Sequence, residues 1–283
     1  MATAADVQHL REWISKQPHL PHDADDAFLE RFLLGCKGRL SRCKEVLDMY
    51  YTVRATVPEF FRNRDPTSPE IRDIAKAAFL VTLPRLTPAG HHVTMQGLLD
   101  ADPRRFSALA YMRRLFMRMD AFLATEVCAG TAVVVDLAGA TFGHAAGFAP
   151  SLLRRFLVCA QDAWPSRIRE FHIINGPPLA DKILELAKHY VKEKTISKIH
   201  VHKSVETLYA FIPREILPFE YGGKCGHVKD LNDAAQQQLE QSKEWFAEEE
   251  KKLSYLPMRV NDCAVDLDSY FGLNGSFRTL AID

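Results

Sequence analysis

The chain has 283 residues, of which 47% are hydrophobic and 25% are charged, the proportions of an ordinary globular protein. Its 36 basic and 36 acidic side chains balance to a net charge of zero, which argues against bulk binding of nucleic acid, since that needs a basic excess. The length favours about two domains of ordinary size, or one large α/β domain with a helical appendage.

The six cysteines form no CxxC pair and no closely spaced framework, and the first residues lack the basic start and long apolar core of a secretory signal. We therefore expect free thiols in a cytoplasmic protein. The apolar stretch 127–153 is interrupted by Asp136, His144 and several glycines. It is better interpreted as a strand and a loop than as a membrane span.

The first part of the chain predicts helices. One short helix is expected over residues 4–16, and in the next the apolar positions Phe28, Phe32 and Leu33 recur at helical spacing. The side chains able to cap the helices that follow are Asp23 and Asp25, then Ser41, and then Ser68, which stands before a proline. We expect a compact N-terminal helical domain over residues 1–77.

From residue 78 the pattern changes to strands that alternate with helices. Strands are expected over 79–83, 92–98, 131–137, 170–174 and 198–202, and helices over 102–124, 150–161, 179–191 and 205–211. This alternation predicts an α/β domain with a mostly parallel sheet flanked by helices, over residues 78–228. Residues 229–283 are expected to add a charged amphipathic helix over 230–253 and an irregular tail that pack on this domain.

Motifs of catalysis and cofactor binding are missing from the chain. There is no GxSxG, no GxGxxG and no GxxxxGK[ST], so we expect neither an enzyme nor a bound cofactor. His200 and His202 share one face of a predicted strand, but no third ligand follows at suitable spacing, so we expect no metal site. Asp136 ends an apolar strand, where capping of the next loop is favoured over the role of a catalytic base.

The predicted helix 179–191 is amphipathic, with a charged face opposite its apolar stripe. The pattern fits either a plain surface helix or a lid over a cavity. Arg167 and Arg169 stand two residues apart at the entrance of a strand, so they point the same way, and Lys194 and Lys198 follow the helix. Basic groups that converge there would bind an anionic headgroup or a membrane surface.

Several ordered motifs resemble the CRAL-TRIO family, in the branch that holds the alpha-tocopherol transfer protein and the cellular retinaldehyde-binding protein. The motifs are DDAFLERFLLGCKGRLSRCKEVLDMYYTVR, GTAVVVDLAGATFGHAAGF, WPSRIREFHIIN, EKTISKIHVH and IPREILPFEYGG, and the tail FGLNGSFRTL is similar to that of insect-type members. The resemblance implies a helical N-terminal domain and a lipid-binding domain that holds one hydrophobic molecule under a gating helix, here residues 178–191.

The resemblance also implies two groups of site residues. The positions of a basic cleft for phosphoinositide headgroups are Lys37, Arg167, Arg169, Lys194 and Lys198. The positions that line the ligand cavity are Thr131, Val133, Val135, Ala140, Phe156, Cys159, Ala160, Phe171 and Ile173, and on the gating helix Leu179, Ile183, Leu186 and Ala187. Val135 and Ala140 replace large aromatic side chains of the tocopherol protein, which suggests a different cargo or binding pose.

The expected function is non-enzymatic. The protein would bind one small lipophilic molecule, such as a retinoid, a tocopherol-like compound or a terpenoid, and transfer it between membranes. Phosphoinositide headgroups would assist release during transient, peripheral membrane contact. The alternative is a phosphoinositide-binding adaptor without lipid transfer. An enzyme acting on a lipophilic substrate is disfavoured, because no nucleophile or cofactor motif is present.

Overall fold

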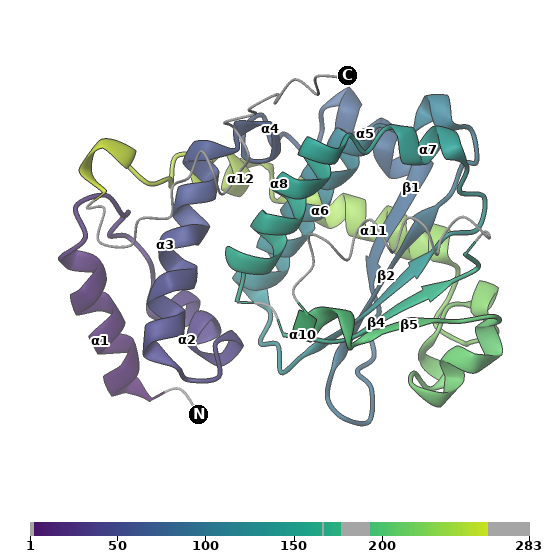
Figure 1. Ribbon diagram of the computed structural model, residues 1–283, viewed down its shortest axis with the longest axis horizontal. Helices are drawn as coiled ribbons and strands as arrows, with labels where there is room; N and C mark the ends of the chain where they lie inside the picture. Colours follow the sequence, from purple (N-terminus) through teal and green to yellow (C-terminus); the bar gives the residue numbers. More distant parts are fainter. Residues whose placement is uncertain (1–2, 166, 177–192, 260–283) are drawn as a thin grey trace, which may run out of the picture.

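The computed structural model describes residues 3–165, 167–176 and 193–259 of the chain, with the elements labelled in Figure 1. Its N-terminal part holds the helices α1 (Ala4–Ser15), α2 (Asp26–Gly35), α3 (Leu40–Thr56), α4 (Pro58–Phe61) and α5 (Pro69–Ala77). Figure 1 shows α1, α2 and α3 together on one side of the molecule, with the sheet on the other side. The change from helices to strands falls between residues 77 and 78.

Two of the predicted helix caps are confirmed. The side chain of Asp25 accepts the backbone N–H of Phe28 at 2.7 Å and begins α2, and the hydroxyl of Ser68 accepts from Ile71 before α5. The predicted cap Ser41 is wrong. Lys37 and Gly38 end α2 with left-handed backbone (φ 60° and 69°), so α3 begins at once and Ser41 already lies inside it.

The sheet has five strands in the order β1 (Ala78–Thr82), β2 (His92–Leu98), β3 (Thr131–Asp136), β4 (Ile168–Ile174) and β5 (Ile199–Val201). Strand β1 is antiparallel to β2, and the other neighbours are parallel. The predicted α/β fold with a mostly parallel sheet is confirmed.

Helices connect the strands and cover the sheet. They are η1 (Pro103–Arg105), α6 (Ala108–Thr125), α7 (Phe142–Ala146), α8 (Pro150–Asp162), α10 (Glu193–Ile196), η2 (Val205–Ala210), η3 (Arg214–Ile216) and η4 (Phe219–Tyr221). The expected helix 102–124 is interrupted, because Ser107 accepts the N–H of Ala110 and starts a separate helix. Among the described residues, no helix is long and apolar enough to cross a bilayer.

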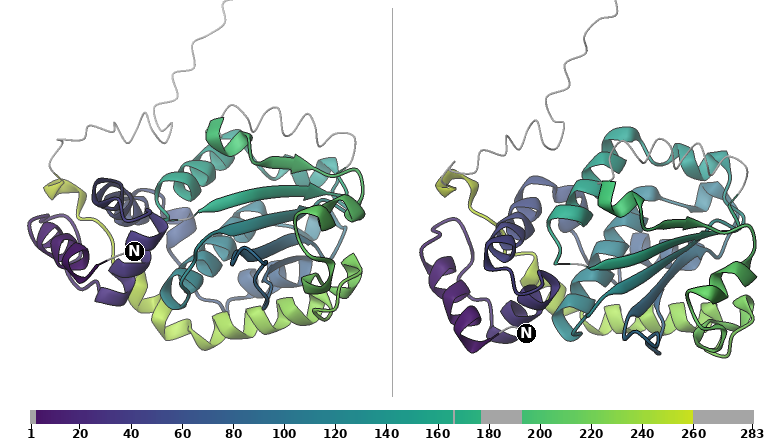
Figure 2. Two further views of the ribbon diagram at one scale, coloured as in Figure 1. Left: turned by 90° about the horizontal axis from the view of Figure 1, so that it is seen from below. Right: turned by 60° about the horizontal axis from the view of Figure 1, so that its bottom comes forward.

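One face of the sheet is closed by a tight core. Its buried strand residues are Phe79, Val81, Val93, Met95, Ala132, Val134 and Ile174, and they pack against Leu208, Ile212, Ile216, Leu217 and Val228. Figure 2 shows α11 (Val228–Gln241) on this side of the molecule and α8 on the other. Burial of these side chains stabilises the fold by roughly 1.5–3 kcal/mol each.

The C-terminal part holds two further helices where one was expected. The helix is interrupted at Ser242, whose hydroxyl donates to the carbonyl of Gln238, and α12 (Lys243–Glu249) follows. Phe246 of α12 packs in a core with Ile71 and Met117. A last turn, η5 (Leu256–Met258), lies near the end of the described residues.

Candidate functional site

The second face of the sheet is only half buried, and it is mainly apolar. On β3, Thr131, Val133 and Val135 are half buried, whereas the alternating residues are fully buried. Phe171 of β4 pairs with Val133 and is also half buried. We call the side of the sheet that bears these four residues the half-buried face. It holds five of the predicted ligand positions, since Ile173, 9% exposed, pairs with Val135.

Helix α8 lies on this side of the sheet (Figure 2) and carries several apolar side chains together with polar ones. Leu152, Leu153, Phe156, Leu157, Val158 and Ala160 are all only half buried. Five of these side chains pack in part against the core under the N-terminal helices and stay half buried: Leu152, Leu153, Phe156, Val158 and Ala160.

The structure brings together most, but not all, of the predicted ligand residues. Phe156 and Ala160 are half-buried residues of α8, and Ala140 is a half-buried residue of the loop after β3. Cys159 is not on open surface: its side chain is fully buried in the core under the N-terminal helices, and burial raises the pKa of its thiol. The predicted residues Leu179, Ile183, Leu186 and Ala187 lie outside the described residues.

Two of the residues predicted for a basic cleft, Lys37 and Arg167, lie where the N-terminal helices meet β4. The guanidinium of Arg167 donates to the carbonyl of Leu34 in the last turn of α2, at 3.4 Å. The turn that follows carries Lys37, which is exposed. Helix α2 can lie this close because residue 35 is glycine: a Cβ there would stand 1.9 Å from the carbonyl oxygen of Pro165. Arg167 and Lys37 are thus brought to one junction.

Two more cations of the cleft lie on either side of Arg167. Arg169 is exposed and donates to the carbonyl of Ala129 at 3.2 Å, and its side chain crosses over Gly130, where a Cβ would stand 2.6 Å from it. The ammonium of Lys198 donates to the carbonyl of Ile168 at 2.6 Å. Lys194 belongs to α10, and its side chain lies outside the described part of the structure.

The cations of the cleft act on a neighbouring histidine. The pKa of His91 is lowered, first because burial disfavours the imidazolium and then because the charges of Arg169 and Arg167 repel it, against an opposing effect of Glu170. Arg169 and Arg167 therefore both lie close enough to His91 to disfavour its protonation.

A histidine cluster lies at the opposite, closed face, between β4, β5 and η2. The Nδ1 of His172 and the Nε2 of His202 are 2.9 Å apart and share a hydrogen bond, and the rings of His172 and His200 stack at 5.1 Å. The prediction for His200 and His202 missed His172, because a residue in the neighbouring strand gives no local signal. No group of metal-ligating residues is found in the described ranges.

Asp136 has the structural role that its position predicts. Its carboxylate accepts the backbone N–H of Ala138 at 2.8 Å, the amide of Asn175 at 2.9 Å and the hydroxyl of Tyr221 at 2.6 Å. These bonds hold the carboxyl end of β3 against the segment around Tyr221. Capping of the loop is thus confirmed.

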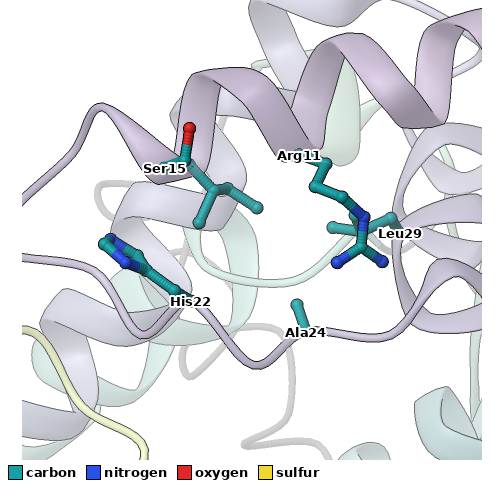
Figure 3. A pocket seen from close by; sticks show the side chains of 6 residues that line it. Arg11, Ser15, His22, Ala24 and Leu29 are labelled. Carbon is teal, nitrogen blue, oxygen red and sulfur yellow. The ribbon is translucent and has the colours of Figure 1, made fainter.

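Two hollows lined by described residues lie elsewhere. One, of about 50 Å3, lies between α1 and α2 beside Arg11, His22 and Leu29 (Figure 3). The other, of about 280 Å3, is open to solvent beside Asp136 and Tyr221. Pockets that enclose a drug-sized molecule measure ~300–1,000 Å3 and are largely closed. Neither hollow competes with the half-buried face as a site for a lipophilic molecule.

Comparisons with known proteins agree with this architecture. A family model described as "CRAL/TRIO domain" matches residues 78–223, and one described as "Pinta-like, UBA domain" matches residues 2–71. The proteins named alpha-tocopherol transfer protein-like of Homo sapiens and Pongo abelii are each 31% identical over 227 residues, which cover 79% of this chain and 66% of theirs. The match thus spans slightly less than two thirds of the length of these relatives.

More distant relatives share the same region. Clavesin-2 of Rattus norvegicus is 27% identical over 222 residues, which cover 77% of this chain and 68% of that protein. The crystal structure of Sfh5 superposes with a TM-score of 0.51 at 14% identity, and covers 81% of this chain and 90% of that one. At this identity the superposition shows a shared fold.

Proposed function

Because the chain belongs to the CRAL/TRIO domain family, whose members bind and transfer lipophilic ligands, we propose that it binds one small hydrophobic molecule against the half-buried face and α8 and carries it between membranes. Phosphoinositide headgroups at the basic cleft would assist release. Its membrane contact would be peripheral and transient. The gating helix expected over residues 178–191 remains a prediction from the sequence alone.

The observation that carries this proposal is the apolar surface left half buried by Val133, Val135, Phe171 and the side chains of α8. The side chains of α8 pack in part against the core under the N-terminal helices, and the apolar surface that they and the strands keep is what a lipophilic molecule would cover. A lipophilic molecule laid on this surface would lose ~400 Å2 of water contact, which favours binding by ~10 kcal/mol before the cost of ordering it. Release into water would then be slow, so delivery requires contact with a membrane.

The basic cleft supplies a reason for that contact. Arg167, Arg169 and Lys198 surround the entrance of β4 and lie near Lys37 of the α2 turn. Each basic residue near an anionic bilayer contributes ~1 kcal/mol to attraction. A headgroup that binds one conformation of the protein more tightly than another would shift the balance between loaded and releasing states.

The cargo need not be the one named in the relatives. The printed name of the human relative refers to alpha-tocopherol. This chain has the small side chains Val135 and Ala140 along its expected cavity. Smaller walls change the volume and shape of a site, and discrimination between lipophilic ligands depends on that fit.

The test is to denature freshly purified full-length protein and to identify extracted lipids by mass spectrometry. We expect one lipophilic molecule per chain, or stoichiometric uptake of an added lipid by protein that was purified empty. Repeated empty extracts without uptake would contradict carriage. If phosphoinositide vesicles were still bound, that result would instead support an adaptor.

A further inference from the structure

A polar pair interrupts the apolar surface of the half-buried face. The hydroxyl of Tyr111 on α6 donates to the Oε1 of Gln96 on β2, at 2.9 Å. In the register of the sheet, Gln96 pairs with Val135, so both side chains project from the same face. Both members of the pair are half buried. They thus stand beside the surface that the proposed cargo would occupy.

The hydrogen bond from Tyr111 fixes the orientation of the Gln96 carboxamide. A tyrosine hydroxyl has one hydrogen, and here Oε1 of Gln96 accepts it. The Nε2 of Gln96, with two N–H donors, is therefore directed away from Tyr111, and it donates to no group among the described residues. Burial raises the pKa of Tyr111, so the hydroxyl keeps the hydrogen that orients the pair. The Nε2 is not one of the enclosed polar atoms without a partner among the described residues, so it is accessible to an acceptor oxygen of a molecule that lies against this face.

The two arginines that follow Tyr111 on α6 are occupied by other groups. On α6, Arg113 donates to Glu70 and to the carbonyl of Glu59. Arg114 is fully buried and donates to Gln236 and Asn232. Neither guanidinium is available as a counter-ion beside Gln96. A carboxylate brought beside Gln96 would lose its hydration without gaining either of these two guanidinium groups as a counter-ion, whereas a neutral oxygen needs only the amide N–H.

We propose that the Gln96 carboxamide, oriented by Tyr111, is a polar anchor of the lipid site and selects neutral lipophilic molecules that carry a hydrogen-bond-accepting oxygen, such as an alcohol, an aldehyde or a ketone. This inference rests on the proposed lipid-binding function and adds a ligand class to it. Apolar contacts would supply most of the affinity. The anchor would decide which end of the molecule enters and would disfavour hydrocarbons and fatty acids.

The experiment uses three fluorescent probes that share one aromatic body and chain: pyrenebutanol, butylpyrene and pyrenebutyrate. Dissociation constants are measured by fluorescence titration of the full chain. The readout is the dissociation constant of pyrenebutanol divided by the dissociation constant of butylpyrene. In Gln96→Leu we expect this ratio to rise about tenfold, because only the alcohol loses a partner in the apolar site. Pyrenebutyrate should bind wild-type protein more weakly than pyrenebutanol.

Two further variants make the result specific. Gln237→Leu makes the same chemical change on the exposed surface of α11 and should leave the ratio unchanged. Tyr111→Phe frees the carboxamide and should raise the ratio by a smaller factor, and it tests the anchor should Gln96→Leu fail to fold.

An unchanged ratio in both site variants, with butylpyrene still bound, would overturn the anchor and leave lipid binding intact. Tighter binding of the acid than of the alcohol would overturn the neutral ligand class. Failure of wild-type protein to bind any of the three probes would overturn the proposed function and the anchor together.

Discussion

The guanidinium of Arg54 donates to both carboxylate oxygens of Asp120 at 2.7 Å, inside the core where α3 meets α6. Arg64 donates to the same carboxylate at 2.6 Å, and all three side chains are at most 3% exposed. The cation of Arg54 also lies 3.4 Å from the ring centre of Tyr50. One buried anion therefore joins the N-terminal helices to the α/β part.

Removing the carboxylate of Asp120 should strongly destabilise the fold. In Asp120→Ala two buried guanidinium groups would lose their shared partner, and we expect the free energy of unfolding to fall by about 3–5 kcal/mol. Urea denaturation followed by circular dichroism measures the change. The control is Asp73→Ala, which removes a partner of Lys76 in an exposed pair and should shift stability by no more than about 1 kcal/mol. Equal effects of the two variants would show that the buried cluster is not a major link.

The close approach of α2 to residue 165 gives a second prediction. A methyl group in Gly35→Ala would collide with the Pro165 carbonyl, which is backbone and cannot rotate away. We expect a loss of about 1–3 kcal/mol in unfolding free energy and weaker sedimentation with phosphoinositide vesicles, because Lys37 and Arg167 stand on the two sides of this contact. Glu30→Ala, on the exposed side of α2, should change neither quantity. Wild-type stability in Gly35→Ala would show that the junction opens without cost.

The order of strands and helices was predictable because alternation of apolar residues and cap chemistry are local signals. Asp25 and Ser68 cap as predicted, and Asp136 holds its loop. Ser41 fails because a left-handed turn at Lys37 and Gly38 moves the start of the helix, and propensity alone does not report that geometry.

Long-range contacts explain what the sequence did not reveal. The capping contact from Arg167 to Leu34 joins residues 133 positions apart, and the Arg54–Asp120 pair spans 66. The resemblance implied Cys159 as a ligand position, and neighbours from the N-terminal helices bury its side chain. The hydrogen bond between Tyr111 and Gln96 likewise depends on how α6 packs against β2, which the sequence does not show.

Charge reversal in the basic cleft should separate ligand release from ligand uptake. In the double variant Lys194→Glu, Lys198→Glu we expect transfer of bound pyrenebutanol to vesicles with phosphatidylinositol bisphosphate to slow at least tenfold, since each lost cation removes ~1 kcal/mol of attraction. Uptake of the probe in the absence of vesicles should stay at the wild-type level. Stopped-flow fluorescence measures both rates.

The matched control places the same charge change elsewhere. Lys16→Glu, Lys224→Glu alters two exposed lysines outside the cleft and should keep most of the phosphoinositide response. A slow rate in both double variants would point to net charge rather than to the cleft. A wild-type rate in the cleft variant would remove the cleft from the release mechanism.

The histidine cluster predicts how stability depends on pH. The pKa of His172 is lowered to about 4, first by burial and then by the charges of His202 and His200. Glu170, whose carboxylate lies 3.3 Å from the Nε2 of His172, faces the same ring from β4, and Thr207 holds the Nδ1 of His202 from η2. The folded protein therefore resists a proton that the unfolded chain accepts at its ordinary pKa of 6.5.

Because the unfolded state binds more protons between these two values, stability should fall as pH drops from 6.5 toward 4, by on the order of 3 kcal/mol from His172. Urea midpoints at several pH values down to 4.5 measure this slope, above the range in which carboxylates with lowered pKa values, such as Asp65 at about 2, take up protons. His172→Gln keeps a polar group but cannot become charged, so we expect a flatter profile, whereas His22→Gln on the surface should retain the wild-type slope. An equally steep profile in His172→Gln would assign the acid sensitivity to other groups, because the titrating ring would then be absent while its effect remained.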